Sequence, residues 1–131
     1  MEMKANRFRF RAWDKTAEKM RDVLSIQKLL KFSIDSVFVN VDIDRLIIMQ
    51  STGLCDKNGK EIFEGDLISV FNAYTNKECV GVAQVSFSYD YAGGWVASAD
   101  GERNLNIGTR TDIITVRGNI YENPELLEDA K

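Results

Sequence analysis

The chain has no histidine, and it has only two cysteines and one proline among its 131 residues. A serine or cysteine nucleophile needs a base within hydrogen-bond reach, and histidine is the commonest base in such pairs. A closed zinc site needs four Cys or His ligands, which this chain cannot supply. Neither G-x-x-x-x-G-K nor G-x-G-x-x-G, the phosphate-binding glycine patterns, occurs. We therefore expect a protein that is not an enzyme and that holds no metal and no cofactor.

Long apolar segments are also missing. The longest uninterrupted apolar run covers the four residues 46–49, whereas a helix that spans a bilayer takes about twenty. The first residues lack the apolar stretch and the cleavage site of a secretory signal. We expect a cytoplasmic protein without a membrane partner, in which Cys55 and Cys79 remain thiols.

The composition is that of a globular protein, with 44% apolar and 28% charged residues. The length suits a single domain over residues 1–131. Charge is unevenly spread: residues 1–31 carry nine Lys or Arg and four acids, a net +5, so the overall −3 leaves −8 for the remainder. Such a split indicates either an anionic partner for the basic part or two parts that attract each other in the fold.

Short β-strands dominate the pattern, because apolar and β-branched residues alternate between turn signals about every ten residues. The interval 23–32 fits a helical face and an extended strand equally well, so both alternatives stay open. Asn58-Gly59 predicts a tight turn, and Gly81 predicts a bulge in a long strand. Asn123 as N-cap and Pro124 at the first helical position predict a short C-terminal helix. The expected strands cover residues 7–13, 19–23, 37–41, 45–50, 67–71, 78–89, 95–97 and 112–117.

Four segments carry a resemblance to a known family. They are 10–15 (FRAWDK), 49–54 (MQSTGL), 56–66 (DKNGKEIFEGD) and 118–126 (GNIYENPEL). In this order the chain resembles the YopX family of phage and prophage proteins, although Ser51 and Cys55 depart from the residues that relatives often carry. The resemblance implies a mainly β fold with an SH3-like barrel, a bacterial host cell, and no known reaction. We expect an N-terminal hairpin region over 1–50, and a barrel region with the C-terminal helix over 51–131, with the seam near 50–54.

The first expected strand is the most suggestive candidate site. Its alternation places Arg7, Arg9, Arg11 and Trp13 on one face. Arginines can contact phosphates while an aromatic ring stacks on a base, which would make this face a nucleic-acid-binding surface. The alternative is a solvated sheet face whose arginines pair with acids of the negatively charged remainder. We favour the second interpretation, because a pI near 5.0 suits a dedicated nucleic-acid binder poorly.

Two further groups of residues each have a structural and a functional interpretation. Glu61, Glu64 and Asp66 could supply paired carboxylates for acid and base catalysis, but they equally suit a turn that opens a strand. Asp56, Asn58 and Gly59 resemble part of a calcium loop, but glycine falls at the fourth place instead of the sixth. We favour structural roles for both groups.

These observations lead to one preferred function and one alternative. The preferred function is a phage accessory protein that works as a small β interaction module, through an unknown protein partner or self-association. The alternative is a nucleic-acid-binding protein that uses the basic N-terminal strand face.

Overall fold

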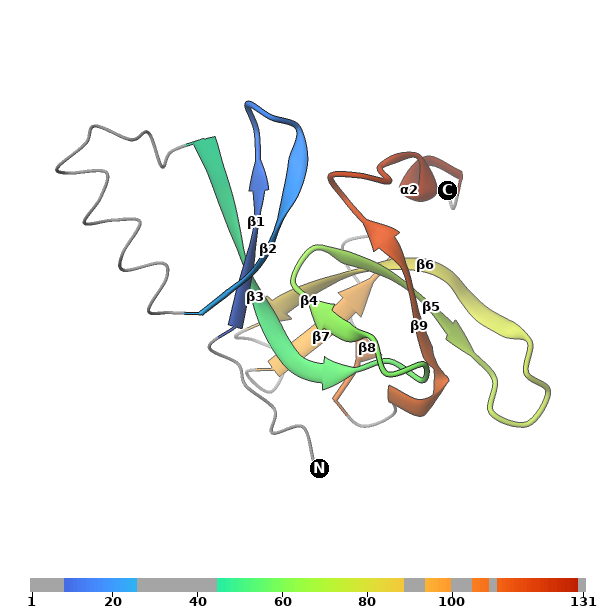
Figure 1. Cartoon of the computed structure of the whole chain (residues 1–131). Coiled ribbons are helices and arrows are strands. Elements are labelled where there is room, and N and C mark those ends of the chain that lie inside the picture. Colours follow the sequence, from blue (N-terminus) through green and yellow to red (C-terminus); the bar gives the residue numbers. More distant parts are fainter. Residues whose placement is uncertain (1–8, 26–44, 89–93, 100–104, 109–110, 130–131) are drawn as a thin grey trace, which may run out of the picture.

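A computed structural model describes residues 9–25, 45–88, 94–99, 105–108 and 111–129, and these residues form a mainly β protein of two antiparallel sheets (Figure 1). The described elements are β1 (Arg9–Asp14), β2 (Lys19–Ser25), β3 (Leu46–Cys55), β4 (Glu61–Phe63), β5 (Asp66–Phe71), β6 (Glu78–Ser88), β7 (Gly94–Ser98), β8 (Leu105–Asn106), the 3₁₀ turn η2 (Thr111–Ile113), β9 (Ile114–Asn119) and α2 (Glu125–Asp129).

The first sheet has the strand order β2-β1-β3-β4. β1 and β2 form the predicted N-terminal hairpin, and β1 also pairs with the first half of β3, where Phe10 lies opposite Gln50. The second half of β3 pairs with β4, where Ser51 lies opposite Phe63. β3 therefore runs through the predicted seam at 50–54 and links the hairpin to the rest of the protein.

The second sheet has the order β8-β7-β6-β5-β9 and curves like half of a barrel (Figure 1). β5 lies between β6 and β9 and is buried along almost its whole length, since Asp66 through Val70 are all inaccessible. The main apolar cluster joins this sheet to β4, and its fully buried members include Ile62, Ile68, Val85, Ile107 and Ile114. Burial of these branched side chains supplies the main driving force for folding.

Most of the sequence-based elements are confirmed. The predicted bulge is present: Ile68 lies opposite Ala83 and Val70 opposite Val80, so β6 carries one extra residue around Gly81. The 56–59 turn is also present, with the Gly59 amide donating to the Asp56 carbonyl at 3.0 Å and a positive Gly59 φ of 84°.

Other elements differ from the prediction. β3 extends five residues beyond the expected end at Gln50, because its second half pairs with β4. The short strand β8 has no signal of its own in the sequence. α2 begins at Glu125, and the Asn123 side chain accepts a hydrogen bond from the Asn119 amide, not from the helix.

Some expectations fall outside the described residues. The expected strand over 37–41 lies there, as does the open interval 23–32 except for residues 23–25, which belong to β2. No helix among the described residues is long and apolar enough to cross a membrane.

Candidate binding site at the junction of the two sheets

Arg9 pairs with an acid of the C-terminal part of the chain. Its Nε and Nη2 donate to the two carboxylate oxygens of Glu61 at 3.1 and 3.0 Å, a bidentate arrangement. The Ser51 hydroxyl donates a third hydrogen bond to the same carboxylate at 2.6 Å. The pair lies near the surface, with 42% of the Arg9 side chain and 18% of the Glu61 side chain exposed.

Arg11 makes a second and deeper connection. Its Nη2 lies 2.8 Å from Asp66 Oδ1, and the exposed fractions of the two side chains are only 12% and 2%. The guanidinium group also stacks over the Phe63 ring at 4.7 Å. Asp66 Oδ2 accepts a hydrogen bond from the Phe63 amide at 2.8 Å. Burial raises the pKa of Asp66 above 3.8, against the lowering effect of Arg11.

Trp13 contacts the opposite end of the chain. Its ring stacks on Tyr121 with centroids 5.6 Å apart and an interplanar angle of 17°. Arg7, the remaining residue of the candidate face, lies outside the described residues. The expected pairing of arginines with acids is thus confirmed for Arg9 and Arg11, although the expected solvation is wrong for Arg11. The stacking partner of Trp13 is a side chain of the protein itself.

The calcium-like segment is a structural turn. One carboxylate oxygen of Asp56 accepts hydrogen bonds from the Asn58 and Lys60 amides at 2.9 Å, which closes the turn. The other oxygen accepts from the Val116 amide of β9, also at 2.9 Å. Asp56 therefore fastens the turn to the edge of the second sheet. Among the described residues, no three His, Cys, Asp or Glu side chains are grouped so that they could hold a metal ion.

Two more buried polar residues of the family-like segments have similar roles. Asp14 accepts hydrogen bonds from the Ala17 and Thr16 amides and pairs with Arg21 at 2.7 Å. The Ala17 amide, followed by Arg21, lowers the Asp14 pKa to about 2. The Asn119 carboxamide oxygen accepts from two amides of the following turn. These side chains stabilise turns at the ends of strands.

Glu64 differs from the two neighbouring acids. Its backbone amide donates to the Gln50 carbonyl at 2.9 Å, and its carboxylate accepts only a long 3.4 Å hydrogen bond from the Gln50 amide. Glu64 has no ion pair among the described residues, whereas Arg9 and Arg11 neutralise Glu61 and Asp66. The three acids that the sequence groups together are therefore not one catalytic set.

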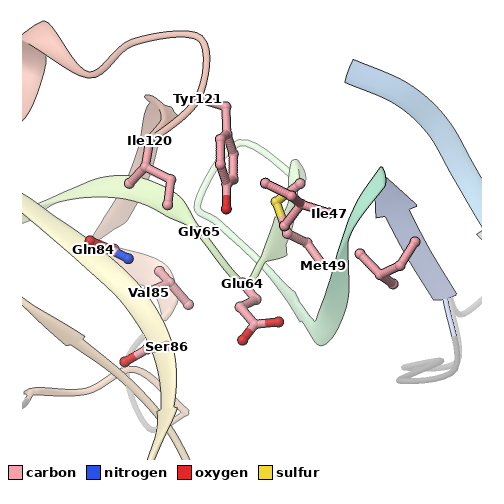
Figure 2. A pocket seen from close by; sticks show the side chains of 10 residues that line it. Ile47, Met49, Glu64, Gly65, Gln84, Val85, Ser86, Ile120 and Tyr121 are labelled. Carbon is pink, nitrogen blue, oxygen red and sulfur yellow. The ribbon is translucent and has the colours of Figure 1, made fainter. Parts of the chain in front are cut away.

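The Glu64 carboxylate lines a pocket of about 170 Å³ between β3, β6 and the turn after β9 (Figure 2). Ile47, Met49, Val85 and Ile120 supply apolar walls. Gln84 and Ser86 of β6 and Tyr121 of the turn after β9 also line the pocket.

The backbone of Gly65 lines this pocket and connects the elements around it. Its amide donates to the Val85 carbonyl and its carbonyl accepts from the Ile120 amide, both at 3.0 Å. Its φ is +87°, and a Cβ at this position would lie 3.2 Å from the Met49 sulfur. Glycine therefore lets β6, β3 and the C-terminal turn meet at one point.

Sequence reasoning located Glu64 but missed the pocket. Its lining residues come from four separate parts of the chain, and only the glycine of the E-G-D segment, which has a positive φ in the structure, signals a close approach of backbones. The long-range pairing of β3 with β1 brings Ile47 and Met49 to this place, and no local pattern predicts that pairing.

Fold and site together define a small antiparallel β domain in which the charged residues of the family-like segments hold two sheets together. Comparison with family models gives a match to YopX (YopX protein) over residues 9–128. The chain belongs to the YopX family. A solved structure, protein EF1440 from Enterococcus faecalis, shares the fold with a TM-score of 0.58 and 24% identity, over 91% of this chain and 96% of that chain. No curated protein matches.

Proposed function

We propose that this YopX family member is a phage or prophage accessory protein that acts without catalysis, as an SH3-like β module that binds another protein. The observation that carries the proposal is the internal pairing of its charged motif residues. Arg9, Arg11, Glu61 and Asp66 all have partners within the protein, so they are not free to serve a substrate or an anionic polymer.

The same observation weighs against catalysis by paired carboxylates. General acid and base catalysis of that kind needs two carboxyl groups that face one reacting bond. Glu64 faces the pocket, but Asp66 is 1% exposed and bonded to Arg11 and the Phe63 amide. The Glu64 carboxylate, without a second free carboxyl group beside it in the described part of the chain, suits ligand recognition better than general acid and base catalysis.

The nucleic-acid alternative requires arginines that can reach phosphates. Binding of Arg11 to a phosphate would leave the Asp66 carboxylate buried without its cation, which is strongly unfavourable. Arg9 is half-exposed and could exchange partners at lower cost. One such arginine among the described residues of the face gives weak support for a nucleic-acid-binding surface.

The test is affinity capture from lysates of the phage-carrying host, with and without nuclease. We expect a protein that survives nuclease treatment and that, once purified, binds this chain with defined stoichiometry in a calorimetric titration. Loss of all captured material after nuclease treatment would contradict the proposal.

A further inference from the structure

The pocket at Glu64 differs from the other acid sites because the Glu64 carboxylate forms no ion pair among the residues that the structure describes. The Gln84 amide and the Ser86 hydroxyl make no side-chain hydrogen bond among the described residues, and the Tyr121 ring makes only the stack on Trp13. Glu64 makes one long contact. Elsewhere Asp14, Asp56 and Asp66 each accept two or more hydrogen bonds. A carboxylate that lines a pocket and forms no ion pair among the described residues can bind a ligand cation.

The size of the pocket limits what can enter. Small-molecule and cofactor sites enclose about 300–1,000 Å³, so a pocket of about 170 Å³ is too small for a nucleotide. A cavity of about 150 Å³ holds one benzene molecule. One amino-acid side chain is therefore the largest group that this pocket can enclose.

The chemistry of the walls selects a long side chain with a positive end. Ile47, Met49 and Ile120 form an apolar lining suited to a methylene stem, and Glu64 supplies the negative charge (Figure 2). An ammonium group is a compact charge with three donors on one nitrogen, whereas a guanidinium group is a larger planar fork with five donors. The small pocket suits the more compact group, and the Glu64 carboxylate supplies its acceptor.

We propose that the pocket formed by Glu64 and the apolar side chains of β3 and the C-terminal turn binds a lysine side chain of a partner protein. This inference rests on the proposed function and adds the contact through which the partner is recognised. The lysine stem packs against Met49 and Ile120, and its ammonium group binds the Glu64 carboxylate.

The test uses Nα-acetyl-lysine-N-methylamide as the probe and its norleucine analogue as the uncharged control, titrated into the ¹⁵N-labelled full chain. A probe of about fourteen heavy atoms at ordinary ligand efficiency binds with a Kd of about 1 mM. We expect amide shifts centred on Gly65, Val85 and Ile120, and an affinity for the lysine probe at least about fivefold above that for norleucine.

Variants assign the effect to the pocket. Glu64→Gln keeps the acceptor for the Gln50 amide, so the fold should persist while the affinity for lysine falls to that for norleucine. Glu18→Gln is the matched control, because Glu18 is an exposed acid of the β1–β2 turn that does not line the pocket, and it should bind like the unmodified chain. Ser86→Leu places an apolar side chain in the pocket and should abolish binding of both probes.

Several outcomes would overturn the inference. These are equal binding of lysine and norleucine, tighter binding of the arginine analogue, absence of shifts at 20-fold excess over the expected Kd, or a dimer that Glu64→Gln dissociates, which would assign the pocket to a second copy. In each case a partner captured independently of Glu64 would leave the proposed function standing. Absence of any protein partner, with the lysine probe still bound, would remove the proposed function alone.

Discussion

Replacement of Arg11 by methionine tests how the hairpin is held to the second sheet. The apolar stem can still pack on Phe63, but the 2.8 Å ion pair with Asp66 is lost. Asp66 is 1% exposed, so its charge stays buried without its cation and keeps only the hydrogen bond from the Phe63 amide. Loss of one partner of a buried pair costs about 3–5 kcal/mol of unfolding free energy. For a domain of this size that lowers the melting temperature by about 10–20 °C.

Arg9→Met is the matched control, since it removes the other arginine of the same strand face. The Arg9 and Glu61 side chains are 42% and 18% exposed, and Glu61 keeps the hydrogen bond from Ser51. Partly exposed pairs contribute about 0–1 kcal/mol. Urea unfolding at pH 7, followed by the fluorescence of Trp13 and Trp95, should separate the two variants by at least about 2 kcal/mol.

The pH dependence of the lost stability shows whether the buried charge of Asp66 causes it. In Arg11→Met the folded-state pKa of Asp66 rises further above 3.8, the value of an unperturbed Asp. An acid whose pKa is raised by folding loses stability as pH rises through that pKa. The deficit should therefore shrink toward pH 4, and Asp66→Asn in the same background should recover stability at pH 7. Equal losses for Arg11→Met and Arg9→Met, or a deficit independent of pH, would show that the buried charge of Asp66 is not the cause of the lost stability.

Three further predictions concern the turns. Gly65→Ala should destabilise the protein by about 1–3 kcal/mol, because the position has a positive φ. The loss should exceed that of Gly59→Ala, because of these two positions only Gly65 would bring the new Cβ to 3.2 Å from a neighbouring sulfur. Equal shifts of the melting temperature would contradict this. The Asp14 pKa of about 2 lies below its unfolded value of 3.8, so its stabilisation is present above 3.8 and disappears as pH falls through 2; Asp14→Asn should flatten urea-measured stability across this interval, and an unchanged pH profile would count against it. Asp56→Ala should remove the acceptor of the amides that Asp56 binds, and each amide left without a partner lowers the unfolding free energy by about 1–3 kcal/mol. Hydrogen exchange of the Val116 amide should become faster, and unchanged exchange there would contradict the role of Asp56.

The alternating pattern of β1 and the Asn58-Gly59 turn were predictable because both are local. Strand period and turn chemistry depend on residues that are neighbours in the sequence. The pairing of the strand-face arginines with acids followed from the uneven charge of the two parts. The sequence did not show which acids take which arginines, because Arg9 and Glu61 are brought together only by β3.

The low exposure of Arg11 and the existence of the pocket could not be predicted from the sequence for the same reason. Arg9 and Arg11 are chemically identical and two residues apart, yet 42% of the Arg9 side chain and only 12% of the Arg11 side chain is exposed. That difference arises from the turn between β4 and β5, where Phe63 and Asp66 enclose Arg11. Among the described residues the Glu64 carboxylate forms no ion pair, and a one-dimensional pattern does not show which of the three neighbouring acids the two arginines take.

The most direct test of the central claim is whether the arginine face binds nucleic acid. Fluorescence anisotropy should be measured with labelled single- and double-stranded oligonucleotides at low and physiological salt, for the unmodified chain and an Arg7→Gln/Arg9→Gln variant that keeps Arg11. Arg117→Gln is the control, since it removes an exposed arginine of β9. We predict no binding even at low salt, because Arg9 and Arg11 are paired internally and the remainder of the chain is acidic. Tight binding whose affinity falls with salt at a log–log slope of about −0.9 per phosphate contact, and which the Arg7→Gln/Arg9→Gln variant alone weakens, would contradict the account.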